Sequence, residues 1–135
     1  MVADEHWKSE PEEHDYPAAT DYLSLVAPPA LVQATVEALR AAPLVHRKAK
    51  DLLRASRLPL LSTSNVHVTK NFKKVLDGGK LSPVLIVRGN IASDSPLTVA
   101  DGYHRICASH HLNEDADIPC QLVDLVQRDG PTMSG

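Results

Sequence analysis

One stretch of the sequence, beginning at Leu97, constrains the fold of this chain more than any other. It opens with a short apolar segment, 97–100, whose β-branched residues predict a β-strand. Asp101-Gly102 follows as a turn pair, and from Tyr103 onward apolar residues recur at the three- and four-residue spacing of a helix. Another apolar segment, 118–123, predicts the next strand. The chain is therefore expected to pass from strand to helix through a tight Asp-Gly turn.

This turn predicts an anion-binding site. Gly102 lets the backbone approach a ligand closely, and the unpaired N–H groups of a helix N-terminus suit a phosphate. His104 and Arg105 stand in the first helical turn, where cations oppose the helix dipole and do not serve helix stability. Asp101 is a candidate to hold a metal ion, to accept a proton or to cap the helix. The alternative is purely structural, because strand–Asp-Gly–helix is a common connection.

The letters Gly102-Tyr103-His104-Arg105, set between two predicted strands, resemble the core motif of the ParB/sulfiredoxin superfamily. Partition proteins of the ParB type carry G-x-R-R, sulfiredoxins carry G-C-H-R, and the superfamily's free serine kinases carry D-G-H-H-R. The resemblance extends over about half of the chain, from Leu58 to Leu125. It agrees with the order of the predicted elements, which indicates an α+β domain: a small mixed sheet of about four or five strands with helices on its faces.

The resemblance implies nucleotide binding, because the superfamily's residues at the positions of His104 and Arg105 lie at nucleotide phosphates. Gly102 and Tyr103 complete the expected phosphate site, with CTP or ATP/ADP as the ligand and Mg²⁺ at Asp101. The implied activity is that of an NTPase or a small-molecule phosphotransferase, with Asp101 and His104 as candidate catalytic groups.

Three departures limit what the resemblance carries. Sulfiredoxins need a reactive Cys where this chain has Tyr103, which argues against repair of oxidised peroxiredoxin cysteines. The second Arg of G-x-R-R is missing, and the sequence ends at Gly135 without a stretch for a helix-turn-helix. The free serine kinases use an upstream Glu as base, and in that region Asn65 and His67 are the candidates here.

A basic block over residues 46–80 is the second feature that indicates an anionic partner. It holds nine Lys or Arg against two Asp, so it carries +7 in a chain whose net charge is −3. This block supports the alternative function, a non-enzymatic ParB-type module that binds nucleic-acid backbone or a protein. A DNA-cleaving role would need a metal cluster, for which only scattered Asp residues are present. Four lysines of the block could each contact an anion or simply face solvent. They are Lys50, Lys70, Lys73 and Lys74.

The N-terminal part is expected to lie outside the superfamily core. Residues 1–16 are acidic and without period, which predicts a mobile tail ahead of one domain over 17–135. Within that domain, 17–43 is a helical extension of two helices, broken by Pro28-Pro29, that covers a sheet face or makes a contact in a homodimer. The core is expected over about 44–126.

Between the extension and the Asp-Gly turn, the sequence predicts several short elements. They are a candidate strand over 44–50, a helix over 51–56 capped by Asp51, an edge strand over 58–61, a helix from Thr69 or Asn71 to Leu76 with Gly78 after its end, and a central strand over 83–88.

The composition indicates a cytoplasmic protein without a membrane partner. No apolar run approaches the roughly 20 residues of a membrane span, and the acidic N-terminus does not resemble a signal peptide. The two cysteines, Cys107 and Cys120, fall in apolar positions and are predicted to be buried free thiols rather than a disulfide framework.

Overall fold

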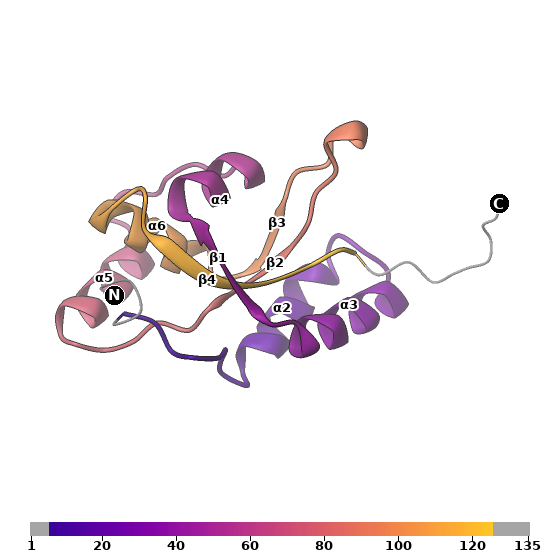
Figure 1. The fold of residues 1–135 in the computed structure, drawn as a ribbon, viewed down its shortest axis with the longest axis horizontal. Helices are drawn as coiled ribbons and strands as arrows, with labels where there is room; N and C mark the ends of the chain where they lie inside the picture. The colour runs from indigo at the N-terminus through magenta and orange to yellow at the C-terminus, as the bar shows by residue number, and fades with distance from the viewer. Residues whose placement is uncertain (1–5, 126–135) are drawn as a thin grey trace.

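A four-stranded mixed sheet organises the fold in the computed structural model, which describes residues 6–125 (Figure 1). Its strands are β1 (Leu44–Lys48), β2 (Val84–Val87), β3 (Thr98–Asp101) and β4 (Asp117–Val123), in the order β1-β4-β2-β3. β4 runs antiparallel to β1 and parallel to β2, and β3 runs antiparallel to β2. The predicted α+β class with a small mixed sheet is confirmed.

Strand β2 is buried along its whole length, as its continuous apolar sequence predicts. Successive side chains of a strand point to opposite faces, so Val84 and Ile86 join one apolar core while Leu85 and Val87 join the other. An interior strand of this kind needs cover on both faces, which the helices provide.

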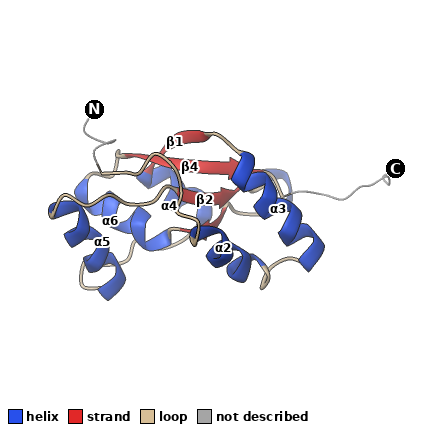
Figure 2. Ribbon diagram, turned by 90° about the horizontal axis from the view of Figure 1, so that it is seen from below, coloured by secondary structure: helices blue, strands red, loops and turns tan. Residues whose placement is uncertain are grey.

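Five helices cover the two faces of the sheet. They are α2 (Asp15–Leu23), α3 (Pro29–Ala41), α4 (Ala49–Ser56), α5 (Val66–Leu76) and α6 (Tyr103–Leu112). α2 and α3 pack against the face of Leu85 and Val87, and the other three pack against the opposite face. Figure 2 shows β1, β4 and β2 side by side. The expected role of the helical extension as cover for a sheet face is confirmed, while its role in a homodimer stays a prediction.

The predicted mobile tail is wrong for residues 6–16, whereas residues 1–5 lie outside the described part of the chain. The Trp7 side chain is 6% exposed and belongs to the core beneath α4, α5 and α6. The backbone around it pairs with Leu81 through two hydrogen bonds of 2.8 Å, from the Lys8 N–H to the Leu81 carbonyl and from the Leu81 N–H to the His6 carbonyl. A single large aromatic side chain outweighs the acidic composition of this stretch.

Three predicted boundaries are also corrected. Residues 58–61 form no strand, because this loop instead holds side chains of α6 through its carbonyl groups. Helix α4 begins at Ala49, with Lys48 in the cap position, so Asp51 lies inside the first turn and is not the cap. Helix α5 begins earlier than predicted, because the Asn65 side chain accepts hydrogen bonds from the backbone N–H groups of His67 and Val68.

Other local predictions are confirmed. The strand predicted over 44–50 is present as β1 but ends at Lys48, because Ala49 begins α4; Gly78 follows α5 with a φ of +87°, as predicted. Cys107 and Cys120 are buried free thiols, and burial raises the pKa of the Cys120 thiol to about 12. Among residues 6–125, no helix is long and apolar enough to cross a membrane.

The burial of Trp7 generates a stability prediction. We expect Trp7→Ala to lower the free energy of unfolding by about 3 kcal/mol or more, because it leaves a cavity in the core. Urea denaturation followed by circular dichroism measures this loss. Leu25→Ala is the matched control, since Leu25 is 80% exposed and should change stability by less than about 0.5 kcal/mol. Equal stability of both variants would show that the 6–16 segment does not pack on the domain.

Candidate functional site

A cleft of about 320 Å³ lies where the N-terminus of α6 faces α5. Its lining is polar and consists of His67, Lys70, Asn71, Lys74, Asp101, Gly102, Tyr103, His104 and Arg105. The structure therefore brings the whole predicted motif together with His67, which comes from a separate helix. The lining cations Lys70, Lys74 and Arg105 outnumber the single carboxylate, Asp101.

Gly102 forms the N-cap of α6 with a φ of +116°, a conformation that L side chains rarely adopt. A Cβ at this position would lie 2.4 Å from Cγ1 of Val84, so the close approach is to the neighbouring strand β2. No side chain caps the helix here, because Asp101 is the last residue of β3 and does not reach the first turn of α6 as a cap. The first N–H groups of α6 thus stand at the cleft without a side-chain acceptor.

The Asp101 carboxylate is held by an ion pair with Arg105. Nη2 of Arg105 donates to Oδ2 of Asp101 at 2.9 Å and also approaches the Pro83 carbonyl at 3.4 Å. Both side chains are more than four-fifths buried, and Nε of Arg105 is buried without a hydrogen-bond partner among the described residues. Burial raises the pKa of Asp101 although Arg105 lowers it. This pair connects the end of β3 to the first turn of α6.

Three rings form a row beside this ion pair. The His104 ring lies 4.8 Å from the His67 ring and 5.5 Å from the Tyr103 ring, measured between centroids. Burial lowers the pKa of His104, and the neighbouring His67 and Arg105 lower it further. The Tyr103 hydroxyl donates to the Pro59 carbonyl at 2.5 Å, which fixes the first residue of α6 to the loop before α5. These surroundings therefore favour the uncharged form of the His104 imidazole.

The opposite wall of the cleft was only partly expected from the sequence. Of the three lysines of α5, Lys70 and Lys74 line the cleft and Lys73 does not. Asn71, which was expected only as a helix start, lines it as well. The sequence does contain a signal for this wall. Positions 67, 70, 71 and 74 recur at the three- and four-residue spacing that places side chains on one face of a helix.

Lys50 lies apart from the cleft. Its ammonium group pairs with Asp115 at 2.9 Å, and the ion pair raises the pKa of Lys50. The structure thus does not bring Lys50 together with the other predicted phosphate-site residues, and its phosphate contact stays a prediction. Asn65, a candidate base in the sequence, is occupied as the N-cap of α5.

The cleft offers a metal ion one carboxylate. No group of three or more His, Cys, Asp or Glu residues within 6–125 could hold a metal on its own. Mg²⁺ does not need such a group, because it commonly binds through one or two carboxylates together with substrate phosphates and water. Asp101 is the one lining residue that fits this role.

Comparisons of the sequence with protein-family models and with curated proteins, and of the fold with solved structures, found no match. The resemblance to the ParB/sulfiredoxin superfamily therefore stays a prediction from the motif.

Gly102 and Gly78 both have a positive φ, so substituting each by Ala gives a matched test of the Asp101-Gly102 turn. We expect Gly102→Ala to lower the free energy of unfolding by about 2 kcal/mol or more, because backbone strain and the collision with Val84 add together. Gly78→Ala should cost about 1 kcal/mol, since a Cβ there meets no atom within 4 Å and only the backbone strain remains. Thermal or urea unfolding compares the two variants. A smaller loss for Gly102→Ala than for Gly78→Ala would contradict the packing of Gly102 against β2.

Proposed function

We propose that this chain binds a nucleotide or a similar phosphorylated ligand in the cleft between α5 and the N-terminus of α6. The observation that carries the proposal is the juxtaposition of two independent anion-attracting features. The first turn of α6 has no side-chain cap, and the facing helix contributes Lys70 and Lys74 to the same cleft. Backbone donors at a helix end and ammonium groups on the other side are the usual means of holding a phosphate chain.

The roles within the cleft follow from its contacts. The N–H groups of the first turn of α6 would bind the oxygens of one phosphate, and Lys70 and Lys74 would neutralise the remaining charge. Arg105 would act mainly by bracing the turn, because its Nη2 is already hydrogen-bonded to Asp101. His104 would donate to a phosphate oxygen once protonated. Mg²⁺ accompanying the nucleotide would be held by Asp101 and the phosphates.

Phosphoryl transfer or hydrolysis is the proposed reaction. Asp101 and His104 are the candidate bases of the cleft: burial raises the pKa of Asp101, which makes this carboxylate a stronger proton acceptor, and burial lowers the pKa of His104, which favours its unprotonated imidazole. His67, 4.8 Å from His104 between ring centroids, is the residue best placed to orient that imidazole or the acceptor. The letters of the motif, nearest to those of the free serine kinases, favour a hydroxyl acceptor over water.

The alternative, nucleic-acid binding by the basic block 46–80, has weaker support. Five of the nine cations of this block line two separate hollows of the surface: Lys70 and Lys74 line the cleft, and Arg47, Arg54 and Arg57 line another groove. Neither hollow therefore gathers most of the positive charge that a phosphate backbone would need.

Calorimetric titration with CTP, ATP and ADP, with and without Mg²⁺, tests the proposed binding. We expect one of these nucleotides to bind, and we expect His104→Ala, Lys70→Ala and Lys74→Ala each to weaken it about three- to tenfold, since a partly solvated charge contact is worth about 1 kcal/mol. Lys73→Ala is the matched control on the same helix and should bind like the wild type. Arg105→Ala is unsuitable alone, because it leaves the buried Asp101 carboxylate without its partner.

Absence of binding by all three nucleotides, or equal weakening in the Lys73 control, would overturn the site assignment. Release of phosphate from the bound nucleotide, measured with and without serine and other small alcohols, then separates hydrolysis from transfer. Binding without any turnover would leave a nucleotide-binding module and remove the catalytic roles of Asp101 and His104.

The lowered pKa of His104 generates a pH prediction. A bound phosphate favours the imidazolium, so binding takes up a proton and affinity should rise as the pH falls from about 7.5 to about 5.5. The phosphate also titrates in this range, but this contribution is the same for wild type and His104→Gln. The ratio of their affinities should therefore increase at low pH. A pH-independent ratio would show that His104 does not contact the phosphate.

A further inference from the structure

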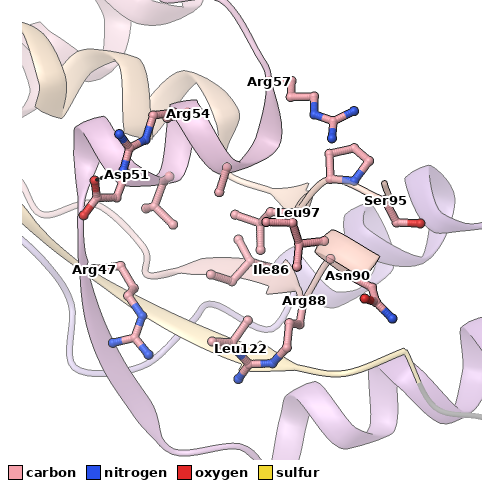
Figure 3. A pocket seen from close by; sticks show the side chains of 15 residues that line it. Arg47, Asp51, Arg54, Arg57, Ile86, Arg88, Asn90, Ser95, Leu97 and Leu122 are labelled. Carbon is pink, nitrogen blue, oxygen red and sulfur yellow. Dashed lines mark ion pairs between the residues drawn. The ribbon is translucent and has the colours of Figure 1, made fainter. Parts of the chain in front are cut away.

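A second hollow, of about 440 Å³, lies between α4 and the β2–β3 hairpin and shares no residue with the cleft (Figure 3). Its floor is aliphatic, with Leu52 from α4, Ile86 from β2, Leu97 from the residue before β3 and Leu122 from β4. Figure 1 shows the hairpin projecting from the body of the domain. We refer to this hollow as the arginine-rimmed groove.

Four arginines surround the aliphatic floor. Arg47 comes from β1, Arg54 from the last turn of α4, Arg57 from the C-cap of α4, and Arg88 from the residue after β2. Against these four cations, the lining contains one acid, Asp51. The lining itself therefore carries an excess of positive charge in a protein whose net charge is −3, although Asp94 and Asp124 lie next to Arg57 and Arg88.

The bonds that these arginines make within the chain are easily exchanged. Arg54 is 86% exposed and lies 3.7 Å from Asp51, a contact longer than a good ion pair. Arg57 and Arg88 are each more than half exposed and pair with Asp94 and Asp124, which are more exposed still. Exposed pairs of this kind contribute little to stability. An acidic ligand could therefore replace the internal acids at small cost.

The hairpin extends the apolar surface beyond the groove. Ile91, in the short 3₁₀ helix η1 (Ile91–Ser93) at the hairpin tip, is 99% exposed and belongs to the groove lining. Arg57 and Asp94, whose side chains pair between α4 and the hairpin, are the two non-glycine residues with positive φ among residues 6–125. The exposed Arg57–Asp94 pair thus links the end of α4 to the hairpin, and the Ile91 side chain at the hairpin tip is unpacked.

We propose that the arginine-rimmed groove binds an acidic amphipathic helix of a partner protein. The aliphatic floor and Ile91 would receive the apolar face of that helix, and the arginines would pair with carboxylates on its flanks. Charge complementarity excludes a basic segment. Nucleic acid fits less well, because no aromatic side chain lines the groove for base stacking and the floor offers no hydrogen-bonding groups.

A pair of designed peptides tests this proposal on the full chain. One fluorescein-labelled peptide carries Leu at helical spacing with Glu elsewhere, and its counterpart carries Lys in place of every Glu. Fluorescence anisotropy should detect binding of the Glu peptide and none of the Lys peptide. The affinity should fall as salt rises, because exposed charges are screened.

Variants then place the binding on the groove. Arg54→Glu and Arg88→Glu should each weaken the Glu peptide about tenfold, and Ile91→Ser should weaken it without changing the salt dependence. All three side chains are largely exposed, so circular dichroism should show an unchanged fold. The matched controls are Lys73→Glu and Leu25→Ser, which alter an exposed cation and an exposed aliphatic residue elsewhere and should have no effect.

Several outcomes would overturn the proposal. The first is that the Glu peptide does not bind, and the second is that both peptides bind equally well. The third is that Lys73→Glu lowers the affinity for the Glu peptide as much as Arg54→Glu does. Displacement of the Glu peptide by a short DNA duplex, with tighter binding of the duplex, would assign the groove to nucleic acid instead. Nucleotide titrations do not enter this experiment, so its result is independent of the proposed function.

Discussion

The burial of β2 on both of its faces is the constraint on which the rest of the structure depends. Its side chains alternate between two cores, so the sheet needs helices on both sides. α2 and α3 provide one layer, and α4, α5 and α6 provide the other. Because β3 pairs with β2 and leads directly into α6, this arrangement also sets where the first turn of α6 lies. The position of the cleft is a consequence of how the core is covered.

The Asp-Gly turn combines a structural and a chemical role. Gly102 is needed for its positive φ and for its contact with Val84, and the ion pair of Asp101 with Arg105 ties β3 to α6. Because Gly102 is the N-cap, no side chain caps the first turn of α6. This turn borders a cleft whose lining cations outnumber its single carboxylate. The rigidity of the turn therefore supports the proposed function, since backbone donors bind a phosphate best when they are held in place before it arrives.

The basic block 46–80 acquires a different meaning in three dimensions. In the sequence it is one run of nine cations, which suggests one anionic partner. In the fold, α4 and α5 direct parts of it to two separate hollows, while Lys50 is paired with Asp115. One hollow is polar and suits a phosphate, and the other has an aliphatic floor and suits an amphipathic segment. A charge count over the whole block thus does not show that its cations line two hollows of different composition.

The sequence alone determined the α+β class, the buried central strand, the strand–turn–helix motif and the helices of the extension, because these depend on local periodicity and on Gly and Pro. It could not determine the packing of Trp7, since one aromatic residue in an acidic stretch carries no period. Nor could it show that His67 meets His104, or that the face of α5 shared by His67, Lys70 and Lys74 is the one that lines the cleft. Those facts depend on how α5 and α6 pack, which only the tertiary structure decides.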